Sequence, residues 1–314
     1  MNPMLIVNCH NIVSETLNPF DYAAAPRITL DRFILTIDLL SKHYKFISFE
    51  EMLSCAEQSR SDVPTVTLTF DDGYQGVLCH AFPVLKERGI VASVMVVTQA
   101  LESPQLPFHF EELELAFRIS KVKQLKLPGY GQVPLETLEN RINCLWKLKQ
   151  ELKVQPETVR AINHDQILQR LGVDRDQILE EACKHNVFSK LTGENLRVLA
   201  GAGWTIGSHT RTHRTLSCLD DRDAMFEIMK SQDDIRTHLG ISRMPLAYPY
   251  GGNEHVGRRI QEMARKSGYS CALSTKKEEV GLSPNLLSLP RVDITACQSS
   301  IFEKRDRAGN VLAF

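Results

Sequence analysis

Two adjacent carboxylates stand directly after a β-prone run near residue 70. The run is Thr65–Phe70, and it ends in Asp71-Asp72-Gly73-Tyr74. Two like charges this close raise each other's pKa, so they need a proton or a cation between them, and a metal ion would supply that cation. An Asp-Asp-Gly turn is also common at strand ends. This motif alone therefore leaves both interpretations open, a metal site and a plain turn.

A second motif places two histidines four residues apart, again just past a predicted strand. It reads Ser208-His209-Thr210-Arg211-Thr212-His213. On a helical turn or a tight loop, this spacing can present both imidazoles to one ion. Two histidines and one carboxylate leave open positions on a zinc-like ion for water and substrate, which is typical of a catalytic site. The two motifs together favour a divalent metal centre.

A third motif, Tyr248-Pro249-Tyr250-Gly251-Gly252, also follows a predicted strand. Proline and glycine set a rigid turn whose backbone N–H groups could point at a developing oxyanion. Turns of this composition are usually structural, so the motif gains meaning only beside the other two.

The elements that must position these motifs alternate along the chain. Short runs rich in Val, Ile and Thr alternate with longer amphipathic stretches, which indicates repeated βα units and a closed or nearly closed α/β barrel. Barrels of this kind gather working residues at the carboxyl ends of their strands. Helices are expected near residues 30–43, 75–88, 222–239 and 254–266. Strands are expected at Met4–Asn8, Lys45–Ser48, Thr65–Phe70, Val91–Val97, Thr205–Gly207, Met244–Ala247, Cys271–Ser274 and Leu286–Leu289.

Residues 99–190 differ, because helical patterns dominate them. Four helices are expected there, at 111–121, 135–152, 157–171 and 175–184, with a small hairpin around Pro128-Gly129. We interpret the segment as a helical subdomain inserted into a barrel made of residues 1–98 and 191–303, followed by a tail at 304–314. The insertion could brace the barrel or form a lid or substrate-selecting wall, and nothing chemical at helical spacing favours the wall.

Composition and charge narrow the class of protein. The chain has 314 residues, 37 Lys and Arg against 38 Asp and Glu, and a net charge of −1, which excludes a strongly basic nucleic-acid binder. The eight cysteines are scattered without a C-x-x-C pair, so reduced thiols are expected. The amino terminus lacks a basic n-region, and the apolar runs are too short to cross a bilayer, so the predicted compartment is the cytoplasm.

In this order, the three motifs resemble the polysaccharide deacetylase family, also called carbohydrate esterase family 4 or the NodB-homology domain. The resemblance rests on Thr69–Tyr74, Ser208–His213 and Tyr248–Gly251, and it takes in Cys9-His10-Asn11 and Leu289–Asp293. It implies an α/β fold, a distorted (β/α)7 barrel with a helical insertion here. It also implies metal-dependent removal of an N-acetyl group from an amino sugar.

The resemblance also implies a role for each motif residue. Asp71 would be the general base, while Asp72, His209 and His213 would bind the metal, for which Zn²⁺ is favoured. Tyr250 would offer its backbone N–H to the oxyanion. The chemistry of these groups agrees, because a metal ion polarises a carbonyl and lowers the pKa of bound water, and a carboxylate can take the water's proton.

Two departures from the family pattern matter. Many members hold the base with an arginine at the position of Ala247, and Arg291 is the candidate replacement, since a barrel returns its last strand beside its first. The histidine that supplies the general acid is also absent, because none follows His255. His10, at the end of the first strand, could protonate the leaving amine, bind sugar or simply bond to neighbouring backbone. The remaining histidines are expected on the surface or in the core: His43, His80, His109, His164, His185, His238 and His255.

Several functions remain compatible with these residues. The expected partner is an acetylated amino sugar, as an oligosaccharide or linked to a lipid or a nucleotide. A deformylase or an O-acetyl esterase would use the same barrel and metal chemistry. A protein that binds glycans or sugar nucleotides without turnover is a third alternative, although Asp71 would have no purpose in it.

Overall fold

The fold is taken from a computed structural model that describes residues 2–14, 20, 26–58, 62–127, 129, 131–281 and 283–294. The last part of the expected barrel, residues 295–303, lies outside these residues. So do Cys297 and the expected tail at 304–314. The seven described cysteines are free thiols. Within the described ranges, none of the helices combines the length and apolar character needed to cross a lipid bilayer.

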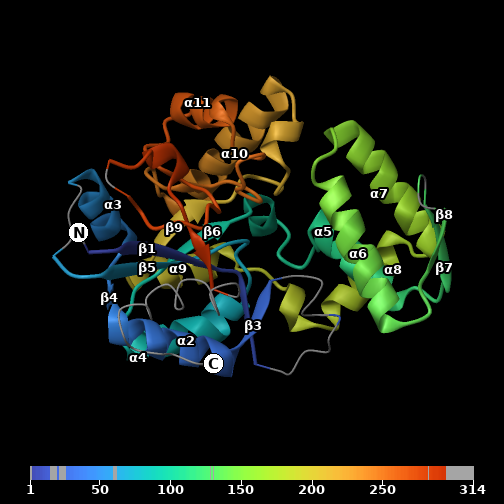
Figure 1. Ribbon diagram of the computed structural model, residues 1–314, viewed down its shortest axis with the longest axis horizontal. Coiled ribbons are helices and arrows are strands. Elements are labelled where there is room, and N and C mark those ends of the chain that lie inside the picture. The colour runs from blue at the N-terminus through green and yellow to red at the C-terminus, as the bar shows by residue number, and fades with distance from the viewer. Residues whose placement is uncertain are drawn as a thin grey trace.

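One curled parallel sheet forms the centre of the molecule (Figure 1). Along it the strands follow the order β11-β10-β9-β6-β5-β1-β12, and β4 pairs with β5 beside this path. Every residue of β1 and β5 is buried, as expected for parallel strands covered on both faces. The strands are β1 Met4–Cys9, β4 Lys45–Phe46, β5 Thr65–Phe70, β6 Ser93–Val96, β9 Thr205–Ser208, β10 Leu246–Ala247, β11 Ala272–Leu273 and β12 Val292–Asp293.

The two edges of the sheet meet through residues 289–293. Leu289 bridges to Leu273 of β11, and Val292 pairs with Val7 of β1, both in parallel. The expected distorted (β/α) barrel is therefore confirmed, with seven strands on the path of the sheet.

The expected strand at Leu286–Leu289 is wrong in its position. Leu286–Ser288 forms a 3-10 turn, in which the Asn285 side chain accepts a hydrogen bond from the Leu287 N–H. Pro290 has no N–H to donate to a ladder, so regular pairing begins only after it, in β12.

Helices cover the outside of the barrel (Figure 1). Ser48 and Glu51 form a capping box at the start of α3. The helix expected at 75–88 is interrupted, because Val77–Ala81 forms a π-turn (η1) before the α-helix. The barrel helices are α2 Leu30–His43, α3 Phe49–Glu57, α4 Phe82–Glu87, α9 Gly193–Gly201, α10 Asp221–Leu239 and α11 Arg258–Lys266. Short 3-10 turns lie at Thr98–Leu101, Asn186–Phe188 and Leu216–Cys218, and β2 (Asn11–Val13) pairs with β3 (Arg27–Thr29).

A second group of helices lies beyond the carboxyl end of β1, on the right of Figure 1. It surrounds an apolar cluster of its own that includes Leu115, Leu145 and Leu168. The group consists of α5 His109–Ile119, the antiparallel hairpin β7 Gln124–Leu127 and β8 Gly131–Pro134, α6 Leu138–Leu152, α7 Glu157–Leu171 and α8 Arg175–Cys183.

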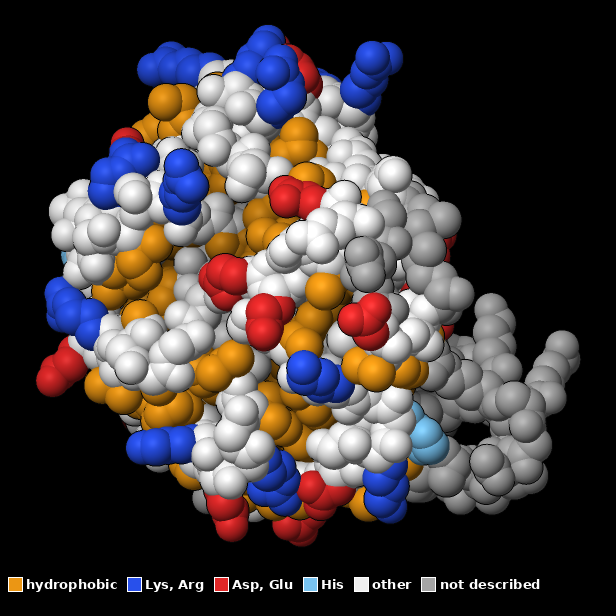
Figure 2. Space-filling view, turned by 90° about the vertical axis from the view of Figure 1, so that its left-hand side faces the viewer, with side chains coloured by type: hydrophobic (Ala, Val, Ile, Leu, Met, Phe, Trp, Pro, Cys, Tyr) orange, Lys and Arg blue, Asp and Glu red, His pale blue; other side chains and the backbone are white. Residues whose placement is uncertain are grey.

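Buried ion pairs fix helix α5 against the barrel. Glu111 accepts a hydrogen bond from the Lys190 ammonium at 2.5 Å and another from the Tyr74 hydroxyl at 2.7 Å. Glu114 lies 2.6 Å from the Arg27 guanidinium. Both glutamates are fully buried. Displacing α5 would separate these two carboxylates from their cations, which is costly for buried ion pairs. The opposite face of the molecule carries side chains of both charge signs with apolar side chains between them (Figure 2).

Candidate metal centre and active site

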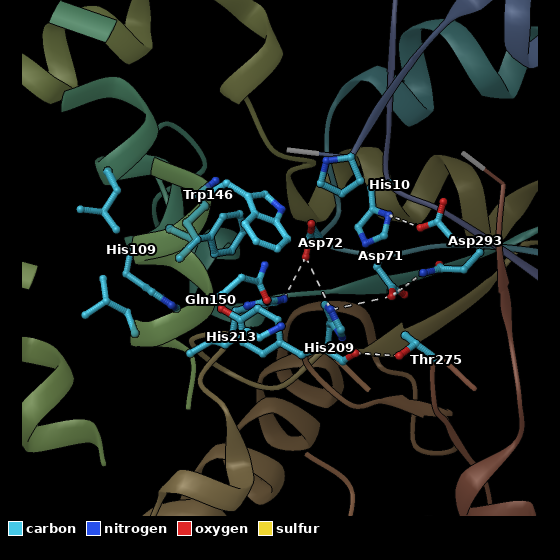
Figure 3. Close-up of a pocket in the computed structure, with 18 of the residues that line it drawn as sticks. His10, Asp71, Asp72, His109, Trp146, Gln150, His209, His213, Thr275 and Asp293 are labelled. Carbon is cyan, nitrogen blue, oxygen red and sulfur yellow. Dashed lines mark hydrogen bonds and ion pairs between the residues drawn. The ribbon is translucent and has the colours of Figure 1, made fainter. Parts of the chain in front are cut away.

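Three predicted metal ligands meet beyond the ends of β5 and β9. The Asp72 Oδ1 atom lies 3.5 Å from His209 Nε2 and 3.4 Å from His213 Nε2. The ligand atoms of all three lie within 4.8 Å of one another, and all three residues are buried. Figure 3 shows them in the middle of the pocket, with residues of the barrel on one side and of the helical group on the other.

The chemistry of this group fits a divalent cation. Asp72 Oδ1 is buried and has no hydrogen-bond partner among the described residues, and burial raises the pKa of Asp72. Burial also holds the pKa of His213 well below its usual value, which leaves a neutral imidazole with a lone pair. His209 Nδ1 donates to the Ala247 carbonyl at 2.8 Å, which fixes Nε2 as its free atom. Two nitrogens and one oxygen are a donor set typical of catalytic zinc.

Backbone strain is concentrated in the same motifs. Asp72, Thr210, His213 and Tyr250 have φ angles of 69°, 64°, 59° and 64°. Among the described non-glycine residues, Ser283 alone shares this left-handed conformation. Such backbone costs about 1–3 kcal/mol per residue and persists where the surrounding structure holds it. The three motifs therefore hold backbone conformations that cost stability, as is typical of functional sites.

The second carboxylate, Asp71, is held by an arginine. Arg291 Nη1 and Nη2 donate to its two oxygens at 2.8 and 2.7 Å, and Asn8 Nδ2 donates at 3.2 Å. Burial by itself would raise the pKa of Asp71, but the charge and hydrogen bonds of Arg291 outweigh it and hold that pKa well below its usual value. Asp71 is thus ionised, oriented and 3.9 Å from His209 Nε2.

His10 and Tyr250 lie on the rim of the same pocket. His10 is on the barrel side, with Nδ1 3.8 Å from Asp293 Oδ2 (Figure 3). The ring of Tyr250 packs 5.0 Å from that of His213, and its carbonyl accepts a hydrogen bond from Thr275 Oγ1 at 2.7 Å. The roles expected for His10 and for the Tyr250 N–H remain predictions.

A cavity of about 700 Å³ lies between the barrel and the helical group. Phe110 of α5 packs against His213 with 4.9 Å between the ring centroids, and Trp146 of α6 is 59% exposed at the rim. His109 and His164 were expected on the surface or in the core, yet both line the cavity. No local signal identifies them, because their place depends on how the insertion packs. The insertion lines the cavity through His109, Phe110, Leu113, Trp146, Lys149, Gln150, Leu152, Lys153, Arg160 and His164.

A family model for polysaccharide deacetylase matches residues 58–141 and 174–272. These ranges contain all three metal-ligand candidates and Tyr250. None of the curated proteins compared with the chain matches it.

Solved structures of similar fold cover almost the whole chain. The deacetylase PplD of Streptococcus pyogenes, in complex with acetate, is 17% identical over 93% of this chain and 92% of its own, with a TM-score of 0.59. IcaB of Ammonifex degensii is 17% identical over 94% and 93%, with a TM-score of 0.56. A de-N-acetylase of Aggregatibacter actinomycetemcomitans is 15% identical over 96% and 98%, with a TM-score of 0.56. At these identities the likeness shows the fold.

Proposed function

Because the chain belongs to the polysaccharide deacetylase family, we propose that it is a metal-dependent hydrolase that removes an N-acetyl group from an amino sugar. The observation that carries this proposal is the ionised Asp71 beside the Asp72, His209 and His213 group, at one end of a cavity large enough for a sugar. The family and the fold of the neighbouring deacetylases support glycan deacetylation. Zn²⁺ is the ion that the donor set favours.

The reaction divides among the residues of the pocket. A divalent cation bound by Asp72, His209 and His213 would polarise the acyl carbonyl and promote ionisation of water. Asp71 accepts the proton of the attacking water, and Arg291 keeps that carboxylate oriented throughout.

Two further groups would complete the reaction. The Tyr250 N–H would donate to the oxyanion, a type of contact whose loss typically lowers the rate about 10²–10³-fold. His10, whose Nδ1 lies 3.8 Å from Asp293 Oδ2, would give a proton to the leaving amine. The same groups could remove a formyl group or cleave an O-acetyl ester, so the acyl group must be tested directly.

The test measures acetate release from N-acetylated sugar nucleotides, sugar phosphates and oligosaccharides, with chelator and after metal is restored. Asp71→Asn should keep the metal content near wild type and lower turnover by roughly 10²–10⁴-fold, because only the base is lost. His213→Ala should lower metal occupancy. His43→Ala, at an exposed position on α2, is the matched control and should change neither.

Two results would overturn the proposal. If Asp71→Asn loses the metal while His213→Ala keeps it, the roles are assigned wrongly. If the metal-loaded protein binds sugar but releases no acid from any of these substrates, the chain is a binding protein and the enzyme proposal fails.

A further inference from the structure

The helical wall of the cavity is basic. Lys149 of α6, Lys153 directly after that helix and Arg160 of α7 line it, and no carboxylate of the described helical group does so. The barrel side adds two cations, Lys277 and Arg291, and the three carboxylates Asp71, Asp72 and Asp293, so five cations line the cavity against three carboxylates. Because the whole chain has a net charge of −1, this excess of positive charge is local to the cavity.

The carboxylate nearest to Lys149 is already occupied. Glu114 lies 2.6 Å from an Arg27 nitrogen and 3.9 Å from Lys149 Nζ, so one negative charge is shared by two cations. Burial lowers the pKa of Lys149, whereas the charges of Glu114 and Glu111 raise it and that of Arg27 lowers it. Glu114 thus faces two cations, and an anion in the cavity would favour the charged form of Lys149.

The carboxylate beside Arg160 is shared in the same way. Glu157 lies 2.7 Å from Arg160 and 3.3 Å from Arg214. Glu112, another acid of these helices, lies 3.7 Å from Arg175 and does not line the cavity. Glu157 thus also faces two cations.

Both lysines lie one aromatic ring away from a metal-ligand candidate. Lys149 Nζ is 5.7 Å from the Phe110 ring centroid, and Lys153 Nζ is 5.8 Å from that of Tyr250. Those two rings pack 4.9 and 5.0 Å from the ring of His213. A single aromatic ring therefore separates each lysine from His213, so one ligand could contact both the lysines and the metal centre.

We propose that the substrate is a phosphorylated N-acyl amino sugar, whose acyl group lies at the metal centre and whose phosphate lies against Lys149 and Lys153. Ammonium groups act as point charges toward phosphate oxygens, and the C-cap residue Lys153, four positions after Lys149, has helical backbone angles that keep it on the same face as Lys149. A sugar phosphate and a nucleotide-linked or lipid-linked sugar share this chemistry. The proposal rests on the proposed function for its placement of the acyl group.

The experiment compares three probes with the metal-loaded full chain: N-acetylglucosamine 1-phosphate, UDP-N-acetylglucosamine and neutral tetra-N-acetylchitotetraose. The readout is kcat/KM for the better phosphorylated probe divided by kcat/KM for the neutral probe. Lys153→Gln should lower this ratio about tenfold by raising KM for the phosphorylated probe, because a charge-assisted hydrogen bond is lost. Lys149→Gln is the second variant and should act in the same direction. Lys147→Gln removes the same charge from an exposed position of α6 outside this cavity and should leave the ratio unchanged.

Binding measurements at different salt concentrations test this inference independently of the proposed function on which it rests. Raising the ionic strength should weaken binding of the phosphorylated probes and not of the neutral one, because screening reaches exposed charges. Calorimetry measures the affinities for both kinds of probe whether or not acetate is released. Preferential binding of a phosphorylated probe that Lys153→Gln abolishes supports the inference even if turnover is absent and the proposed function fails. Equal use or equal binding of neutral and phosphorylated probes, or variants that leave the ratio unchanged, would overturn it.

Discussion

Removing Arg291 should destabilise the protein more than any comparable change at its surface. Its side chain is fully buried, it donates two hydrogen bonds to Asp71 at 2.8 and 2.7 Å, and its Nε donates to the Ser274 carbonyl at 3.0 Å. In Arg291→Gln, the Asp71 carboxylate remains buried without its counter-charge. Breaking a buried pair in this way costs about 3–5 kcal/mol.

The measurement is urea unfolding of the chelated protein near neutral pH. Arg259→Gln is the control, because Arg259 pairs with Asp221 at 2.7 Å but both side chains are exposed, so its loss should cost less than about 1 kcal/mol. The double variant Asp71→Asn/Arg291→Gln removes both charges together. It should be more stable than Arg291→Gln alone, since the unpaired carboxylate is gone.

Two outcomes would refute this reasoning. Arg291→Gln could prove no less stable than Arg259→Gln, or adding Asp71→Asn could fail to restore stability. Either result would mean that Asp71 is not held as a buried anion, and its proposed role as the base would lose its physical support.

Two other predictions concern the paired acids. The pKa of Asp71 is lower in the folded protein than in the unfolded chain, where it is about 3.9. The stability that this difference contributes is fully present above about pH 3.9 and is lost as the pH falls toward the folded pKa. In urea titrations of the chelated protein, the stability difference between wild type and Asp71→Asn should therefore shrink below about pH 4. A difference that stays constant down to pH 2.5 would contradict this. Asp72→Asn should stabilise the chelated protein and raise its Tm, because the buried charge is removed. The same variant should no longer gain Tm from added Zn²⁺, and a retained gain would exclude Asp72 as a ligand.

Local sequence signals place the three motifs well. Thr65–Phe70 is a strand with the expected bounds, because its β-branched residues and its sharp polar end at Asp71 are both local features. The positive φ angles of Asp72 and His213 could not be foreseen. Tertiary packing imposes that conformation on residues that do not favour it.

Features that depend on distant contacts could be predicted from the sequence only in part. The contact of Arg291 with Asp71 follows from placing the last strand beside the first, but that strand lies at Val292–Asp293 and not at Leu286–Leu289. The cavity wall depends on how α5 packs against the rest of the protein. Two ion pairs hold α5 in place, and their partners are separated by 79 positions in one pair and by 87 in the other. No periodicity within residues 99–190 reports such pairs.

The anchoring of α5 has a consequence for how this protein can diversify. The carboxylates that tie the insertion to the barrel, Glu111 and Glu114, are both on α5, whereas Trp146 of α6 and Lys153 directly after α6 reach the cavity. Changes in this second segment that spare Lys149, which lies 3.9 Å from Glu114, therefore leave the anchors in place. Evolution could therefore change the residues of this segment, and with them the substrate specificity, while the residues of the metal centre stay the same.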